Sequence, residues 1–345
     1  MPAGQVLKPG QFRKDVPDAR SGCEFAVSTH AVAPETPHLQ SSPVASGQGT
    51  DNSDRRMNSR MSVTKVGCHT IVFKEDERKD LDLMLRTVAE AGYPGVEHGM
   101  LCDGDGNAAK AKLHAHGLVQ GSLSTNWRAL DTFDDVLRYA DTVGVTLIQM
   151  SGQNRPEDGL AWYDAFAPRF NDAARRAHDA GKKLCYHNHS WEFLRYDEAT
   201  GHIVPGDPNE DAASTGQAHS GVVAMDRLLD RTDPAHAYLC VDIHWVHHGG
   251  LDPVKFVTEH ASRIGYVHIK DMAYVGPQPR RSGVLRFDDS VFAELGRGEV
   301  DLVGTWNALK PLNLPWAAYE QDRSSLPTAE AIGISRAFLR DHLGV

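Results

Sequence analysis

The chain has 345 residues, with 46 acidic and 36 basic side chains and therefore a formal net charge of −10. This balance argues against general nucleic-acid binding, which requires a basic surface. No stretch approaches the roughly 20 apolar residues of a membrane span, and residues 1–5 lack the pattern of a secretory signal. Five cysteines without paired spacing are typical of a reduced compartment, so we expect a cytoplasmic protein.

The first part of the chain differs in composition from the rest. Residues 1–60 are rich in Ser, Pro, Gly, Ala and Gln and show no lasting hydrophobic period. Such a composition cannot bury enough apolar surface to fold, so it predicts a disordered tail. We therefore expect a single folded domain over residues 61–345.

From residue 65 on, short apolar runs alternate with longer amphipathic segments, which predict strands and helices respectively. The predicted strands cover 66–73, 95–98, 118–124, 146–151, 182–189, 237–242, 264–270 and 315–320. The predicted helices follow them at 80–91, 108–116, 132–143, 157–180, 222–230, 253–260, 301–309 and 329–342. Two polar stretches, 195–220 and 274–286, are predicted to be loops.

This alternation determines the fold that we predict. Strands separated by helices indicate a parallel sheet, and eight such units in about 280 residues predict a closed (β/α)8 TIM barrel of the α/β class. The rival fold is an open doubly wound sheet, which usually begins with a Gly-rich turn after its first strand. Residues 68–73 contain no glycine, and we therefore favour the barrel.

Four consecutive predicted strands end on residue types that bind metal ions. The fifth strand runs into His187 and His189, which are two residues apart and point to the same face. The next three strands end at Asp242, His268 and Glu320. Each of these alone is more often a structural residue or a helix cap, but the joint pattern at one mouth of a barrel predicts a divalent metal site. Mn²⁺ is the first candidate, and Zn²⁺, Co²⁺ and Mg²⁺ are the others.

The motifs around these residues resemble the xylose-isomerase-like TIM-barrel superfamily over about residues 64–342. They are Tyr-His-Asn-His at 186–189, Val-Asp at 241–242, Val-His-Ile-Lys-Asp at 267–271 and Tyr-Glu-Gln-Asp at 319–322. The superfamily contains sugar-phosphate isomerases, ketose 3-epimerases and inosose dehydratases, and its metal ligands are commonly Glu, Asp, His and Glu. The resemblance implies Asp242, His268 and Glu320 as ligands. The fifth strand has no Glu, so His187 or His189 must serve, and His187 is the first candidate.

The resemblance also implies a reaction. In the epimerases two metal-bound glutamates exchange a proton, and only Glu320 of such a pair is present here. We therefore expect His187 or His189 to act as the base or acid. The predicted reaction removes a proton beside the carbonyl of a keto-sugar or keto-polyol through an enediolate. It then ends in isomerisation, epimerisation or the loss of a β-leaving group.

Supporting residues are chosen by their place at strand ends. Lys270 follows His268 by two residues, so it is a candidate to contact a substrate oxygen and assist catalysis, or to form a salt bridge at the barrel rim. Glu97 ends the second strand and could bind a hydroxyl group. Trp127 and Trp245 are candidate walls for a sugar ring, although aromatic residues there are more often packing. The expected partner is a small sugar or polyol, and association of identical chains is left open.

Two other functions remain as alternatives. Apurinic-site endonuclease-like phosphodiesterases share this barrel, but they need further His and Glu ligands on strands two to four and a basic groove. A non-catalytic barrel subunit of a sugar-processing complex is the other alternative. An activity assay of the purified chain, alone and with candidate partner proteins, would distinguish such a subunit from an enzyme.

Overall fold

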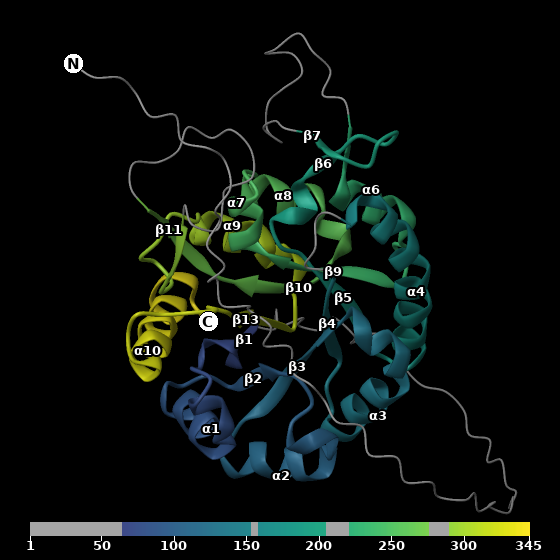
Figure 1. Cartoon of the computed structure of the whole chain (residues 1–345). Coiled ribbons are helices and arrows are strands. Elements are labelled where there is room, and N and C mark those ends of the chain that lie inside the picture. Colours follow the sequence, from purple (N-terminus) through teal and green to yellow (C-terminus); the bar gives the residue numbers. More distant parts are fainter. Residues whose placement is uncertain (1–63, 153–157, 205–220, 276–289) are drawn as a thin grey trace, which may run out of the picture. The chain divides into compact units, whose positions relative to one another are not determined.

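The computed structural model describes residues 64–152, 158–204, 221–275 and 290–345, and the predicted tail over 1–60 lies outside the described residues. Eight parallel strands close into a barrel in the order β1-β13-β10-β9-β5-β4-β3-β2 (Figure 1). The predicted (β/α)8 barrel is therefore confirmed. Its strands are β1 (Lys65–His69), β2 (Gly95–His98), β3 (Val119–Asn126), β4 (Leu147–Ser151), β5 (Lys183–His187), β9 (Ala237–Asp242), β10 (Ile264–Ile269) and β13 (Trp316–Tyr319).

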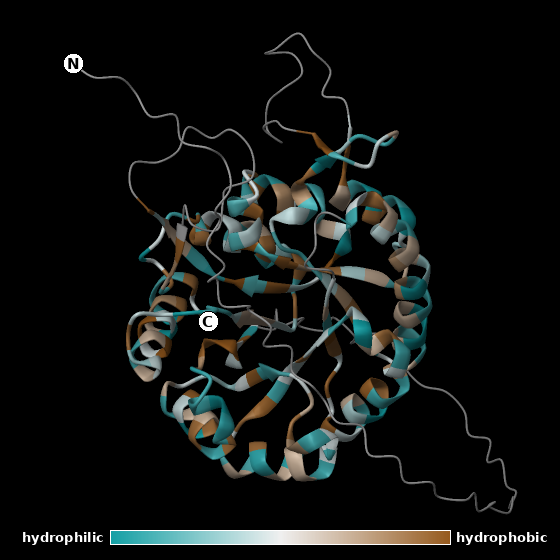
Figure 2. Ribbon diagram, viewed as in Figure 1, coloured by the Kyte–Doolittle hydropathy of each residue, from teal (hydrophilic) through white to brown (hydrophobic). Residues whose placement is uncertain are grey.

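Helices surround the barrel and carry both hydrophilic and hydrophobic residues (Figures 1 and 2). In α4 (Gly159–Asp179), Phe166 and Phe170 are buried and pack on Tyr186 of β5, and their ring centroids lie 5.6 and 6.0 Å from that of Tyr186. Apolar stripes of this kind hold the helices against the sheet. The helices are α1 (Leu81–Glu90), α2 (Gly106–Ala115), α3 (Phe133–Val143), α4 (Gly159–Asp179), α6 (Ala224–Arg231), α7 (Ile243–His248), α8 (Pro253–Glu259), α9 (Leu302–Leu309) and α10 (Thr328–Phe338).

A separate apolar layer fills the barrel interior below the strand ends. Its buried members are Leu147, Cys185, Cys240, Tyr266 and Ala318, with Tyr238 and Trp316 packed against them. Gly121 is required beside this layer, because a Cβ atom there would lie 2.7 Å from the Trp316 ring. The barrel interior is thus a packed apolar core, and the polar groups gather at the carboxyl ends of the strands.

The structure corrects several predicted boundaries. The first strand ends at His69 rather than 73, because the His69 Nδ1 atom accepts the Ile71 N–H group and begins a 3₁₀ turn, Thr70–Val72. The strand predicted over 264–270 ends at Ile269, and β11 (Asp271–Tyr274) then pairs with β12 (Ser290–Ala293) in an antiparallel hairpin. Most of the predicted loop 274–286 lies outside the described residues.

The predicted loop 195–220 was also partly wrong. It contains β6 (Arg195–Tyr196) and β7 (Ile203–Val204), and β6 pairs with both β7 and β8 (Val222–Val223). Two-residue strands are too short to show a period of two, which is why the sequence pattern missed them. Residues 205–220 lie outside the described residues.

None of the helices in the described part of the chain is both long and apolar enough to cross a bilayer.

Candidate metal centre

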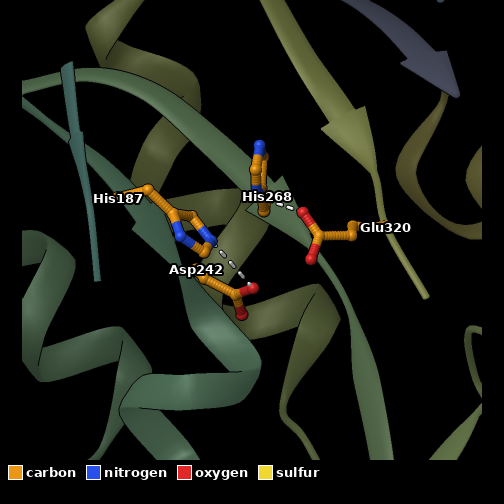
Figure 3. A group of neighbouring side chains, drawn as sticks. All are labelled: His187, Asp242, His268 and Glu320. Atoms are coloured by element: carbon orange, nitrogen blue, oxygen red, sulfur yellow. Dashed lines mark ion pairs between the residues drawn. The ribbon is translucent and has the colours of Figure 1, made fainter. Parts of the chain in front are cut away.

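Four buried side chains meet at the carboxyl ends of neighbouring barrel strands. His187 ends β5 and Asp242 ends β9. His268 is the last residue but one of β10, and Glu320 directly follows β13. Each offers one ligand atom, and these atoms all lie within 4.8 Å of one another (Figure 3). His268 and Asp242 are direct neighbours in the register of β10 and β9. The structure therefore brings together the four residues predicted as ligands.

His187 presents one ring nitrogen to the group and the other to the protein. Its Nε2 atom lies 3.5 Å from Asp242 Oδ2, and its Nδ1 atom lies 3.4 Å from the Ser151 hydroxyl oxygen. Burial, together with the nearby His268, lowers the pKa of His187 to about 3. The imidazole is therefore neutral at physiological pH, which is the form that binds a metal ion.

The two carboxylate oxygens of Asp242 have different roles, because one caps a helix and the other faces His187. Its Oδ1 atom accepts the Trp245 N–H group at 3.1 Å and caps α7. Its backbone is fixed by Asn188, whose side chain accepts the Asp242 N–H at 3.0 Å and donates to its carbonyl oxygen at 3.3 Å. Burial raises the pKa of Asp242 to about 6, although Lys270 opposes this. The helix cap anticipated as an alternative for this residue is thus present, and Oδ2 still faces the group.

His268 lies between two carboxylates. Its Nε2 atom is 3.1 Å from each carboxylate oxygen of Glu97, and its Nδ1 atom is 2.6 Å from Glu320 Oε2. Burial disfavours the charged ring, but Cys240 and the two glutamates outweigh it and raise the pKa of His268 well above its usual value. Nδ1 is therefore the ring nitrogen that faces the other three candidate ligands.

Glu97 was predicted to bind a substrate hydroxyl group, and the structure places it beneath His268 instead. Its side chain is completely buried. It accepts a hydrogen bond from Ser122 at 2.7 Å and lies 3.4 Å from His69 Nε2. Burial alone would raise its pKa, but His268 and His69 outweigh burial and lower the pKa of Glu97 to about 2. Ser122, His69 and His268 thus surround this carboxylate.

Lys270 contributes a buried positive charge beside the group. Its ammonium lies 2.9 Å from Glu320 Oε1 and 3.6 Å from Asp242 Oδ2, and it also forms an ion pair with Asp322. Trp245 lies under the ammonium at 4.7 Å from its ring centroid. Burial disfavours the charge, but the three carboxylates raise the pKa of Lys270 above its usual value. The salt-bridge alternative for Lys270 therefore has direct geometric support.

His189 and the two tryptophans occupy different surroundings. The His189 ring lies 4.7 Å from that of His187 and stacks on Trp191 at 4.1 Å. Its buried Nδ1 atom has no hydrogen-bond partner among the described residues. Trp245 lies 5.6 Å from the His189 ring, whereas Trp127 packs against Trp162 of α4. The structure thus places His189 and Trp245 beside the four candidate ligands, whereas Trp127 lies against helix α4.

A divalent ion fits the four residues. Within the described ranges, His187 Nε2, Asp242 Oδ2 and His268 Nδ1 are buried atoms without a hydrogen bond of acceptable geometry, and each faces another member of the group. Buried polar atoms in native proteins are normally paired, so such a cluster indicates a missing partner. Two nitrogens and two carboxylates suit an ion of borderline hardness. The described residues contain one such group, whereas the phosphodiesterase alternative needs additional ligands.

Comparison with known proteins assigns the family. The model of the xylose isomerase-like TIM barrel family matches residues 85–342. The chain is 26% identical to the inosose dehydratase of Geobacillus kaustophilus (strain HTA426) over 250 residues, which are 64% of this chain and 73% of that protein. The chain therefore belongs to the xylose isomerase-like TIM barrel family.

Solved structures agree with this fold. A sugar phosphate isomerase/epimerase from Parabacteroides distasonis has a TM-score of 0.59 at 20% identity, covering 84% of this chain and 98% of that one. The IolI protein, whose crystal structure holds a zinc atom, has a TM-score of 0.56 at 15% identity, covering 81% and 98%. At these identities the likeness is one of fold.

Proposed function

We propose that this protein is a divalent-metal-dependent lyase or isomerase that acts on a keto-polyol or keto-sugar by removing a proton next to the carbonyl group. The observation that carries the proposal is the meeting of four buried ligand atoms within 4.8 Å of one another at the mouth of the barrel. The name of the Geobacillus relative supports a dehydratase and makes inosose, a keto-polyol, the first substrate to test.

His187, Asp242, His268 and Glu320 would hold the ion. When bound there, a divalent ion would polarise the substrate carbonyl and make the neighbouring C–H bond more acidic. The four residues carry two carboxylates and two imidazoles, so they neutralise a divalent charge without any further anionic ligand. Zn²⁺ and Mn²⁺ are both compatible with this donor set.

His189 is the best-placed group to take the proton. Its Nδ1 atom is buried beside His187 and has no hydrogen-bond partner in the described part of the chain. Burial, with His187 and Lys270 nearby, lowers its pKa well below the usual value for histidine. The ring is therefore unprotonated at physiological pH, as a general base must be at the start of the reaction. Stacking on Trp191 holds the plane of the ring in place.

The two outcomes differ in what happens to the electrons of the broken C–H bond. In a dehydration they form a C=C bond as the C–O bond at the β-carbon breaks, and the oxygen leaves with a proton as water. In an isomerisation or epimerisation the proton returns to carbon. Lys270 would stabilise the negative charge that develops on a substrate oxygen, because its ammonium is buried and held by Glu320 and Asp322.

The test begins with elemental analysis of the purified protein, followed by incubation with inosose and a panel of keto-sugars in D₂O. We expect bound divalent metal and deuterium entering the carbon beside the carbonyl group. Loss of water would define a lyase, and deuterium incorporation without it an isomerase or epimerase. Absence of both across the panel in the metal-loaded protein would refute the proposal.

Paired histidine variants test the role of the base. His189→Gln should lower turnover by about 10²- to 10⁴-fold, the usual contribution of general acid–base catalysis, and should leave the metal content unchanged. His178→Gln is the control, because His178 is exposed in the last turn of α4, which leads to the opposite end of β5. It should retain wild-type turnover. Equal turnover of both variants would remove His189 from the mechanism.

A further inference from the structure

A buried hydrogen-bond network crosses the barrel interior to reach His268. Glu97 belongs to β2, Ser122 to β3, and Tyr266 and His268 to β10, which is three strands away from β2 around the barrel. The Ser122 hydroxyl lies 2.7 Å from Glu97 Oε2 and 2.6 Å from the Tyr266 hydroxyl. All four side chains are buried. The contact between Glu97 and His268 therefore comes from closure of the barrel rather than from neighbouring strands.

The donors of this network can be assigned from its geometry. Ser122 donates its proton to Glu97, so Tyr266 must donate its own to Ser122. His69 accepts the Ile71 N–H group on Nδ1, so its Nε2 atom carries a proton and points it at Glu97. A buried carboxylate surrounded by donors remains ionised and can only accept hydrogen bonds. The fourth neighbour, His268 Nε2, must therefore also carry a proton.

This assignment has a consequence for the ligand group. With the Nε2 proton of His268 directed at both oxygens of Glu97, Nδ1 is the only ring nitrogen able to bind a metal ion. It is also the nitrogen that faces Glu320. A carboxylate partner on the distal nitrogen orients a metal-binding imidazole and increases its basicity. Loss of Glu97 would release both the ring orientation and the tautomer.

We propose that Glu97 is a positioning residue that fixes the ring of His268 with Nδ1 toward the centre of the ligand group, and that it thereby strengthens divalent-metal binding. The inference rests on the proposed metal site and extends it to a residue outside the four ligands. It replaces the expectation that Glu97 contacts substrate, because both oxygens of its carboxylate already face protein donors, namely Ser122, His69 and His268.

The first test measures Zn²⁺ affinity of the full chain by competition with a chelator. Glu97→Gln keeps the size of the side chain and loses its charge, and it should raise the Zn²⁺ dissociation constant by about 10- to 100-fold. Tyr266→Phe is the matched control, because it removes a hydroxyl from the same network, three hydrogen bonds away from His268 by way of Ser122 and Glu97. Tyr266→Phe should change the Zn²⁺ dissociation constant by less than about threefold. It should lower the melting temperature about as much as Glu97→Gln does.

The second test reads the ring of His268 directly. Long-range ¹H–¹⁵N spectra of histidine-labelled, Zn²⁺-loaded protein should show Nε2 protonated and Nδ1 bound to metal, with the signal assigned from the His268→Gln variant. In Glu97→Gln the same ring should lose this single pattern. Glu97→Asp, which keeps the charge but withdraws it by one methylene group, should give an intermediate affinity and serves if Glu97→Gln does not fold.

The outcomes separate this inference from the proposed function. Wild-type protein that binds no Zn²⁺ overturns both the metal site and the role of Glu97. Wild-type protein that binds Zn²⁺ while Glu97→Gln binds it equally well, with the same ring pattern, overturns the role of Glu97 alone. A weakened Glu97→Gln with an unaffected Tyr266→Phe supports the inference, since a merely structural role would weaken both alike.

Discussion

Lys270 offers the sharpest test of the electrostatics at the site. Its side chain is fully buried, and its ammonium contacts the carboxylates of Asp242, Glu320 and Asp322. Replacement by methionine keeps the length of the side chain and its packing on Trp245, but it removes the ammonium that contacts all three carboxylates. The buried carboxylates of Asp242 and Glu320 would then lose the ammonium that both of them contact.

The magnitude follows from the burial of these groups. Removing one partner of a buried ion pair costs about 3–5 kcal/mol, because a charge remains in a medium that solvates it poorly. For a domain of this size 1 kcal/mol corresponds to roughly 2–4 °C in melting temperature. The metal-free Lys270→Met protein should therefore melt about 6–20 °C below the metal-free wild type, measured by thermal unfolding in a chelator.

Metal ion should reverse this loss. A ligand at 100 times its dissociation constant stabilises the folded state by about 2.7 kcal/mol. Because the ammonium no longer competes for Glu320 and Asp242, Zn²⁺ should raise the melting temperature of Lys270→Met by more than it raises that of the wild type. The comparison at equal Zn²⁺ concentration measures this difference directly.

The control for this experiment is an exposed lysine. Lys255 of α8 lies 3.9 Å from Glu259 in a solvent-exposed pair, and such pairs contribute about 0–1 kcal/mol. Lys255→Met should therefore shift the melting temperature by no more than roughly 4 °C. A metal-free Lys270→Met protein that melts as the wild type does, or that gains nothing extra from Zn²⁺, would refute the reasoning about the cluster.

Two further predictions concern stability. Burial raises the pKa of Glu192 from 4.5 to about 7, so its contribution to folding is fully present below about pH 4.5 and is lost as the pH rises through 7. Urea unfolding should show wild type losing up to about 3 kcal/mol over this range relative to Glu192→Gln, and parallel pH profiles would contradict it. Asp271→Ala should destabilise the protein by about 3 kcal/mol or more, because the Asp271 carboxylate accepts hydrogen bonds from four backbone N–H groups. A fall in melting temperature of less than about 2 °C would contradict this prediction. These donors belong to Met272, Gly296, Gly298 and Val300.

The sequence was sufficient to predict those features that depend on local pattern. Apolar runs of strand length ending at His187, Asp242 and His268 indicated both the strands and the edge at which their side chains meet. The short helix α7, which begins directly after Asp242, was missed, because six residues are too few to show a helical period.

Contacts that cross the barrel could not be predicted in the same way. Glu97 and His268 are 171 residues apart in the chain, and their contact depends on the closure and register of the whole barrel. The pairing of Lys270 with Asp322 likewise arises from loops that follow different strands. The residue types at these positions were visible in the sequence, but their partners were not, and so Glu97 was assigned to a substrate hydroxyl group.

The central claim is that four side chains share one divalent ion. Anomalous diffraction at the zinc absorption edge, from crystals grown with Zn²⁺, tests it most directly. The account predicts one strong peak about 2.0–2.2 Å from His187 Nε2, His268 Nδ1 and the nearest carboxylate oxygens of Asp242 and Glu320. A zinc-bearing crystal with no peak between these four residues would contradict it.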